Sequence, residues 1–311
     1  MNMENTDKIY SFIIPHHNCP NLLYRLLDTI PMREDIEIIV VDDNSDVDKV
    51  PIINRSDVQL FSIPASESKG AGHARNVGLD HATGKWLLFA DSDDYYEKNV
   101  ISVLDNFIDS NNDIIYFNYY VKNESSRRTS WWNDLIFSIY KSSNKTKRDI
   151  QRLGLSSNVP WNKMFNHNFI KQNRVRFEEI PMGNDAWFVN YAGYCAETAT
   201  VIDDILYNYL QIQNGITQSK RPLEHHKLVI KSDKKRNKLK MQAKCYDILL
   251  TPGFNKSIVI RDFGKTTYYA LFLKRILTEL PFTIAAIRAF LRKINIIKKI
   301  NYETVNNSTN L

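Results

Sequence analysis

The stretch GKWLLFADSDDYYEKN, residues 84–99, leads an apolar run directly into a cluster of carboxylates. The run WLLFA predicts a short strand that is buried on both faces of a sheet. Asp91, Asp93 and Asp94 follow it, and a turn at Ser92 would bring their side chains to one point. Two interpretations are open from these residues alone: a cation site, or a capping and turn cluster before the next helix.

Apolar runs and helical patterns alternate along the first two thirds of the chain. Strands are predicted at residues 9–15, 36–43, 58–63, 86–90, 113–121 and 201–210. Apolar residues at helical spacing predict helices at residues 21–30, 70–82, 97–110 and 183–196. This alternation is typical of an α/β fold, with a mostly parallel central sheet flanked by helices. Residues 122–150 are polar and irregular, which favours an insertion or a mobile loop.

Polar clusters follow three of the predicted strands. His16 and Asn18 follow the first strand, Asp43 ends the second, and the acids after residue 90 follow the fourth. Ligands of open parallel sheets bind beyond the carboxyl ends of the strands. Crowded carboxylates repel one another, and a divalent cation removes that cost. Because Mg²⁺ and Mn²⁺ prefer oxygen ligands, the pattern favours a site for Mn²⁺ or Mg²⁺ and a phosphorylated ligand.

The composition is that of a folded chain, with 311 residues of which 43% are apolar and 24% charged. Its three cysteines are widely spaced and form no metal-type pair, which indicates a reducing compartment. The first residues lack the basic start and apolar stretch of a signal peptide. No run of 18 apolar residues occurs, so we expect no membrane-spanning helix and a cytoplasmic location.

Positive charge is concentrated in the last third of the chain. Residues 220–300 hold 20 Lys and Arg against 5 Asp and Glu, whereas residues 1–219 hold 21 against 29. We therefore predict an α/β domain over residues 1–219 and a basic α-helical extension over residues 220–311. A basic segment on an acidic body favours an anionic partner, either nucleic acid or a lipid surface.

Residues 282–300 show the pattern of a basic amphipathic helix, with Ile284, Ile287, Leu291 and Ile294 in one apolar stripe. Such a helix can lie in a membrane interface. We expect peripheral contact with the anionic inner face of the cell membrane. The alternative is a helical cap that packs on the first domain and carries ordinary solvated charges.

Four motifs extend this interpretation: FIIPHHN (12–18), IEIIVVDDNS (36–45), GAGHARNVGLDHATGKWLLFADSDD (70–94) and GNDAWF (183–188). In this order and spacing they resemble the family 2 glycosyltransferases of the GT-A fold, of the type that assembles bacterial surface polysaccharides. The resemblance covers residues 9–215. It implies a metal-dependent enzyme that transfers a sugar from a UDP-sugar to a hydroxyl of a saccharide acceptor. An acceptor carried on a polyprenyl diphosphate, as in capsule or O-antigen assembly, would suit the basic extension.

The resemblance also implies roles for individual side chains. It places donor-nucleotide contacts at Pro15, His16, Asn18, Asp43, Arg75, Asp91 and Ser92. Asp43 would bind the uracil, and Arg75 would touch the base or the phosphates. Asp91 and Asp93 correspond to the DxD motif of the family, the first toward ribose and sugar and the second on the metal.

Asp185 corresponds to the catalytic base of the family. One base opposite the leaving group implies a single displacement with inversion, and we find no candidate nucleophile for retention. Trp161 and Lys163, in VPWNKMF, match a stretch that commonly lines the acceptor side. Asn184 stands where the family usually has a Glu that positions the acceptor.

Other interpretations remain open at this point. The pair Trp131 and Trp132 either stacks on an acceptor sugar or packs within its loop. The alternative function is a non-catalytic nucleotide- or nucleic-acid-binding module that uses the basic region. It predicts binding that survives Asp93→Ala and falls steeply with salt. Basic strands with interleaved aromatic residues are absent, so we expect no nucleic acid partner.

Overall fold

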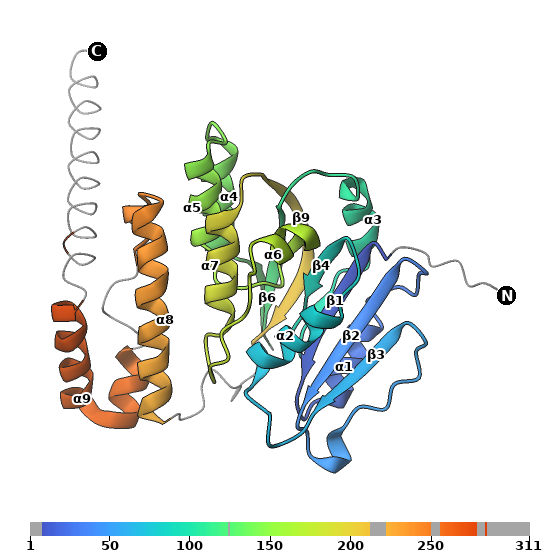
Figure 1. Cartoon of the computed structure of the whole chain (residues 1–311), viewed down its shortest axis with the longest axis horizontal. Helices are drawn as coiled ribbons and strands as arrows, with labels where there is room; N and C mark the ends of the chain where they lie inside the picture. The colour runs from blue at the N-terminus through green and yellow to red at the C-terminus, as the bar shows by residue number, and fades with distance from the viewer. Residues whose placement is uncertain (1–7, 124, 212–221, 250–255, 279–283, 285–311) are drawn as a thin grey trace. The chain divides into compact units, whose positions relative to one another are not determined.

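The chain divides into two compact units, Met1–Ser219 and Lys220–Leu311. The computed structural model describes residues 8–123, 125–211, 222–249, 256–278 and 284. The first unit is an α/β domain in which helices cover a central sheet (Figure 1). The second unit is helical over most of its described residues.

The described part of the first unit contains one sheet of nine strands, in the order β3-β2-β1-β4-β8-β6-β9-β5, with β7 paired to β6. The strands are β1 (Tyr10–His16), β2 (Ile36–Asp43), β3 (Val58–Ile63), β4 (Trp86–Phe89), β5 (Tyr95–Tyr96), β6 (Ile114–Lys122), β7 (Arg127–Thr129), β8 (Lys163–Asn166) and β9 (Ala199–Leu210). Strands β3, β2, β1 and β4 are parallel to one another. Strand β8 runs antiparallel to both β4 and β6, whereas β6 and β9 are parallel. The predicted α/β fold is confirmed, and β8 is an addition to the predicted strands.

Alternate side chains of β4 enter two cores on opposite faces of the sheet. Trp86 and Leu88 pack with residues of α1 and α3, whereas Leu87 and Phe89 pack with residues of α2, α4, α5, α6 and α7. The helices of this unit are α1 (Pro20–Leu27), α2 (Ala71–His81), α3 (Val100–Leu104), α4 (Trp131–Lys141), α5 (Lys147–Leu155), α6 (His167–Gln172) and α7 (Asp185–Cys195). This double burial explains why the strand is apolar at every position.

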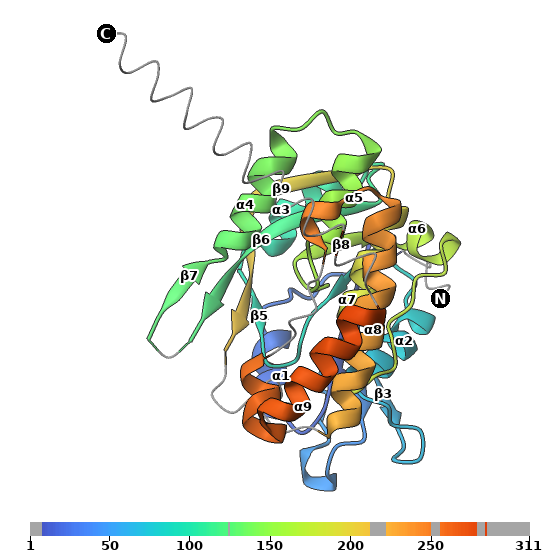
Figure 2. The same ribbon diagram turned by 90° about the vertical axis from the view of Figure 1, so that its left-hand side faces the viewer.

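Residues 122–150 are not an irregular loop, which was one of the two alternatives predicted for them. The segment forms β7, α4 and the start of α5. Strand β7 pairs with β6 and comes before α4 in the chain (Figure 2). Ser130 caps α4 by accepting from the Asn133 backbone, and Thr146 forms a capping box with Asp149 at the start of α5. Both helices bury an apolar stripe made by Ile136, Phe137, Tyr140, Ile150 and Leu153.

Helices α5 and α7 approach each other at a pair of glycines. A Cβ built on Gly154 would lie 2.3 Å from the Cα of Gly193. The two backbones therefore touch without a side chain between them, and this contact fixes α7 against the rest of the helical layer.

The second unit contains α8 (Leu223–Gln242) and α9 (Lys256–Thr278), the latter kinked at Gly264, whose φ is 82°. A short 3₁₀ turn, Tyr246–Ile248, follows α8. Among the described residues, every helix is too short or too polar to cross a membrane. The predicted amphipathic helix at 282–300 lies outside the described residues except for Ile284.

Candidate active site

The carboxyl ends of β1 and β2 are joined by a buried hydrogen bond between two side chains. His16 and Asp42 are neighbours in the parallel register, and the His16 Nδ1 lies 2.8 Å from the Asp42 Oδ1. The Cys19 backbone N–H donates to the other ring nitrogen at 3.3 Å. Both ring nitrogens are therefore used inside the protein, and His16 positions this loop rather than binding a metal. Pro15 lies one residue earlier, within β1.

The loops after β1 and β2 are tied together by Asn18. Its backbone N–H donates to Ser45 Oγ at 2.8 Å, and its Oδ1 accepts from the Asp46 backbone at 2.8 Å. Asn18 has a φ of 58°, a conformation that Asn adopts more readily than most residues. These contacts fix the backbone around the end of β2.

Asp43 ends β2 and is 7% exposed. Among the described residues no group hydrogen-bonds its buried Oδ1. A buried carboxylate oxygen without a donor is costly, so this atom fits a ligand that brings an N–H or O–H group.

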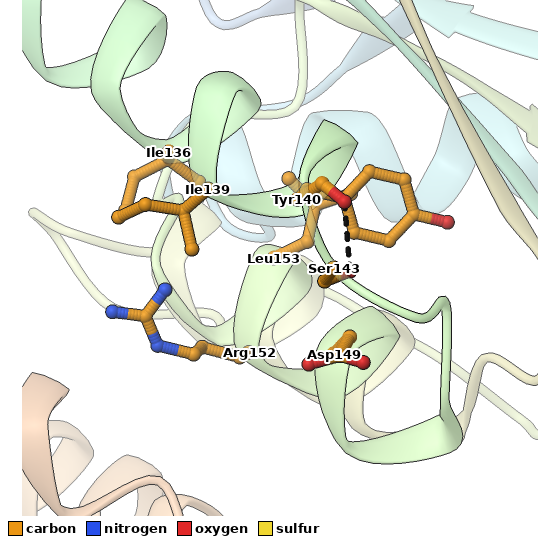
Figure 3. A pocket seen from close by; sticks show the side chains of 7 residues that line it. All are labelled: Ile136, Ile139, Tyr140, Ser143, Asp149, Arg152 and Leu153. Atoms are coloured by element: carbon orange, nitrogen blue, oxygen red, sulfur yellow. Dashed lines mark hydrogen bonds between the residues drawn. The ribbon is translucent and has the colours of Figure 1, made fainter.

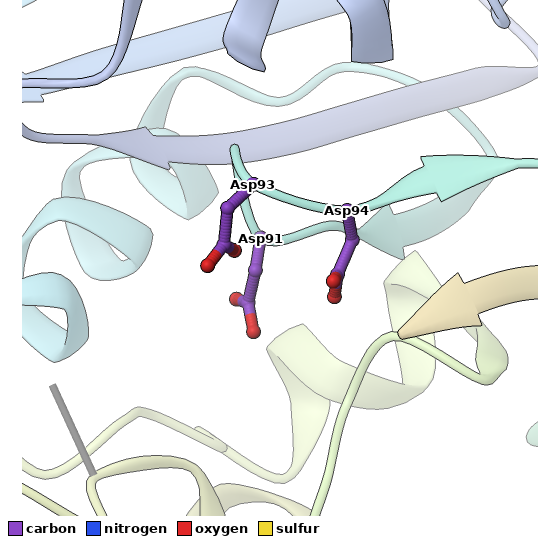
Figure 4. A group of neighbouring side chains, drawn as sticks. All are labelled: Asp91, Asp93 and Asp94. Carbon is purple, nitrogen blue, oxygen red and sulfur yellow. The ribbon is translucent and has the colours of Figure 1, made fainter. Parts of the chain in front are cut away.

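The three acids after β4 lie together at a tight turn (Figure 4). One oxygen of each carboxylate, from Asp91, Asp93 and Asp94, lies within 4.8 Å of the others. The Asp94 N–H donates to the Asp91 carbonyl at 3.0 Å, which closes the turn. The predicted turn at Ser92 is confirmed, and the Ser92 hydroxyl lies 3.1 Å from the sulfur of Cys19.

The acids of this cluster differ in what they already bind. Asp94 is fully buried and accepts from the Tyr207 hydroxyl at 2.8 Å and the Leu210 backbone at 2.7 Å. Asp93 has no side-chain hydrogen-bond partner among the described residues. Burial first, and the Asp91 charge second, raise the pKa of Asp93 to about 6. Asp94 therefore anchors β9, whereas Asp93 fits a hard divalent cation.

Arg75 connects this cluster to α7. Its guanidinium donates through Nη2 to Asp91 Oδ1 at 2.5 Å and through Nη1 to Asp185 Oδ1 at 2.6 Å. Nη1 also donates to the Asn184 side chain at 3.0 Å. One buried cation thus holds the predicted donor acid and the predicted base side by side. Both terminal nitrogens of Arg75 thus contact protein carboxylates, and its expected contact with the nucleotide base or phosphates stays a prediction.

Asp185 is the first residue of α7, and the pKa of its carboxyl group is raised. Burial raises its pKa to about 6, while Arg75 lowers it and Asp91 raises it further. A carboxylate with a pKa near neutrality is well suited to accept a proton from an attacking hydroxyl. Its Oδ1 is held by Arg75, which leaves Oδ2 as the oxygen that could accept such a proton.

The predicted acceptor-side residues Trp161, in the turn before β8, and Lys163, the first residue of β8, are buried. Trp161 is 3% exposed and stacks on Tyr207 and Tyr209, with ring centroids 4.8 and 5.5 Å away. Lys163 is 0% exposed, and its Nζ donates to oxygens of Ser157, Val159 and Asn162. Burial lowers the pKa of Lys163 well below its ordinary value. Lys163 therefore holds the turn before β8 and presents no group to an acceptor.

Two residues at the site were not among those predicted from the sequence. Arg25, in α1, donates through Nη2 to the Asp93 carbonyl at 2.5 Å, and its guanidinium lies 5.3 Å from the centre of the Tyr95 ring. Tyr207 links Asp91 to Asp94 through its hydroxyl. Neither residue belongs to a sequence motif, so only the fold brings them to the acid turn.

A separate small cavity lies between α4 and α5 (Figure 3), away from the strand ends. Within it the Ser143 hydroxyl donates to the Tyr140 carbonyl at 2.7 Å. Its size is that of about one water molecule, which excludes a sugar ring. The acid turn is therefore the better candidate for a catalytic centre.

Comparison with known proteins identifies the relatives of this chain. The model of "Glycosyl transferase family 2" matches residues 11–174. The Escherichia coli protein WfaP, a UDP-Glc:α-D-GlcNAc-diphosphoundecaprenol β-1,3-glucosyltransferase, is 34% identical over 121 residues, 38% of this chain and 48% of WfaP. Glycosyltransferase GlyA of Streptococcus pneumoniae is 28% identical over 67% of this chain and 31% of GlyA. The matched regions thus span about half or less of these two relatives.

A solved structure has the same fold. Staphylococcus aureus TarS 1–349, in complex with UDP-GlcNAc, aligns with a TM-score of 0.59 and 21% identity. The alignment covers 91% of this chain and 81% of that structure. The family match includes β1, β2, β4 and the acid turn. This chain belongs to glycosyl transferase family 2.

Proposed function

We propose that the protein transfers a sugar, with inversion, from a UDP-sugar to a hydroxyl of a saccharide linked to a polyprenyl diphosphate, in capsule or O-antigen type assembly. The observation that carries the proposal is the Arg75 bridge, which sets Asp91 and Asp185 on either side of one guanidinium. TarS binds UDP-GlcNAc, and the name of WfaP specifies a UDP-sugar donor and a diphosphoundecaprenol acceptor. These relatives support the same classes of donor and acceptor here.

The nucleotide would bind at the ends of β1 and β2. The unpaired Oδ1 of Asp43 is suited to accept the N3–H of uracil. Pro15 and His16 offer backbone contacts, and Asn18 and Ser92 complete the walls of the nucleotide site.

Asp93, with Asp91 beside it, would hold Mn²⁺ or Mg²⁺. Such a cation neutralises the diphosphate that leaves when the sugar is transferred. Arg25, which already contacts the Asp93 backbone, adds a positive charge beside this position.

Asp185 would act as the base. The bond from Arg75 fixes one of its oxygens, and the other oxygen takes the proton of the acceptor hydroxyl as the new glycosidic bond forms. The donor diphosphate carries away the electron pair of the broken bond. Asp91 and Asp93 are committed to the donor side, which leaves one base and supports inversion.

We also propose that the protein works at the inner face of the cell membrane. Lys227, Lys231, Lys235 and Lys238 recur at helical spacing and are exposed along α8. Each basic residue near an anionic leaflet contributes about 1 kcal/mol. A lipid-linked acceptor would then be met at the surface where it resides.

The test is release of UDP from a panel of UDP-sugars with Mn²⁺, first without an acceptor. We expect slow, metal-dependent release from one donor, lost in Asp93→Ala. The control is Asp109→Ala, since the Asp109 side chain is 98% exposed and pairs only with Lys85 among the described residues. Equal release by wild type and Asp93→Ala would overturn the metal assignment. If UDP binds and no donor is cleaved, the binding-module alternative is favoured.

A further inference from the structure

The first turn of α4 exposes an aromatic pair that the proposed mechanism does not use. Trp131 is 70% exposed and Trp132 42% exposed, and Leu135, one turn later, is 43% exposed. Large apolar side chains exposed together on one surface mark a binding site more often than a scattered single residue does.

The two rings are held in a defined arrangement. Their centroids are 5.7 Å apart, and the ring planes meet at 80°. Trp132 Nε1 donates to the Ser156 carbonyl at 3.1 Å, which ties the ring to the end of α5. Because Ser130 caps the helix immediately before them, the backbone of the pair is also fixed. Such a corner offers one ring face and one ring edge to a bound molecule.

Buried aromatic rings lie between the acid turn and the strand that precedes this corner. Thr129, two residues before Trp131, pairs with Tyr120 of β6, and the ring of the neighbouring Tyr119 meets Trp161 edge-on with centroids 4.5 Å apart. Trp161 stacks on Tyr207, whose hydroxyl contacts both Asp91 and Asp94. The exposed pair thus follows directly on a strand whose partner, β6, carries the first of the rings that lead to the proposed donor site.

The charged side chain in the helical turn of the pair is acidic, which favours a neutral polar ligand over an anionic membrane. Asp134 is exposed in the same helical turn as Trp132, and it would repel anionic head groups. The nearby Arg127 is paired with Glu97 and lies over the Tyr120 ring, 3.9 Å from its centre. A saccharide offers apolar C–H faces to aromatic rings and hydroxyls to the surrounding polar groups.

We propose that Trp131 and Trp132 bind the saccharide part of the acceptor, at sugars beyond the one that reacts. This inference rests on the proposed function and extends it to a binding surface on α4. It predicts that sugar binding depends on the Trp131 ring, whereas hydrolysis of the donor does not.

The test is saturation-transfer difference NMR with four probes: GlcNAc, chitobiose, lactose and maltose. We expect the wild type to saturate the ring protons of at least one probe. Trp131→Ala should weaken that binding about tenfold, because truncating a Trp that becomes buried under a ligand commonly has an effect of this size. Trp131→Phe should retain most of it. Ile52→Ala, which shortens a 74% exposed apolar residue elsewhere, should change nothing.

Several outcomes would overturn the inference. One is the absence of signal from all four sugars, and another is an equal signal from wild type and Trp131→Ala. A third is loss of binding to phosphatidylglycerol vesicles in Trp131→Ala without any sugar signal, which would assign the pair to the membrane. Donor hydrolysis is measured on the same variants. If the wild type hydrolyses no donor, the proposed function is contradicted. If the wild type hydrolyses a donor but binds none of the four sugars, this inference alone is contradicted.

Discussion

At the scale of single residues, two adjacent acids have opposite roles. Asp94 is fully buried with both oxygens hydrogen-bonded, whereas the Asp93 side chain has no such partner among the described residues. We expect Asp93→Ala to abolish Mn²⁺ binding and leave stability nearly unchanged. Asp94→Ala should retain Mn²⁺ binding and lower the free energy of unfolding by about 2–4 kcal/mol, because it leaves two buried donors unpaired. Calorimetric titration with Mn²⁺ and urea unfolding measure the two quantities.

The reverse pattern would contradict the assignment. If Asp94→Ala lost the metal while folding normally, Asp94 would be the ligand. Asp109→Ala serves as the control for both measurements, because its side chain is almost fully exposed.

The pH dependence of transfer is a second prediction at this scale. Burial raises the pKa of Asp185 to about 6, and only the ionised form can accept a proton. With saturating Mn²⁺, kcat/KM should therefore fall about tenfold per pH unit below about 6 and level off above it. Asp185→Asn should reduce the rate by about 10²–10⁴ and abolish this acid limb. An unchanged acid limb in Asp185→Asn would assign the titration to another group.

Sequence reasoning found most of these acids, but it did not find their connections. Asp91, Asp93 and Asp185 stand in recognisable motifs, whereas the contact of Arg75 with both Asp91 and Asp185 reaches a segment 110 residues away. Lys163 shows a different limit. Its motif implies a place on the acceptor side, whereas its complete burial and its bonds to local oxygens become visible only in the fold.

At the scale of elements, the contact between α5 and α7 has no room for an added side-chain atom. Gly154→Ala would insert a methyl group against the Gly193 backbone. We expect a loss of about 1–3 kcal/mol in the free energy of unfolding, because both backbones must move apart. Urea unfolding should show a lower midpoint with the same slope. Ser138→Ala, on the exposed face of α4, should shift the midpoint far less.

The strands of the first half were predictable because each is a continuous apolar run between turn residues. The segment 122–150 was not, since its polar residues outnumber a stripe of apolar ones that becomes visible only at helical spacing. Its caps, Ser130 and Thr146, were the local signals that could have indicated two helices. Strand β8 is four residues long and pairs antiparallel between β4 and β6, which no periodicity indicates.

At the scale of the whole molecule, the uneven distribution of charge leads to a prediction about membrane binding. Substituting Gln for Lys231, Lys235 and Lys238 together removes three exposed positive charges from α8. Binding to phosphatidylglycerol vesicles should weaken by about tenfold or more and lose much of its salt dependence. Vesicle sedimentation measures the binding, and UDP release without acceptor should remain at the wild-type rate. Unchanged sedimentation would remove α8 from the proposed membrane contact.

The Arg75 bridge also has a thermodynamic consequence for the order of events. Since one guanidinium serves Asp91 and Asp185, any ligand that draws Asp91 away leaves Asp185 with a larger share of that positive charge. The second carboxylate then ionises more readily. By reciprocity, ionising Asp185 must favour the ligand at Asp91 by the same free energy. The two halves of the reaction are therefore linked, and Asp185 is most fully ionised only once the donor is in place.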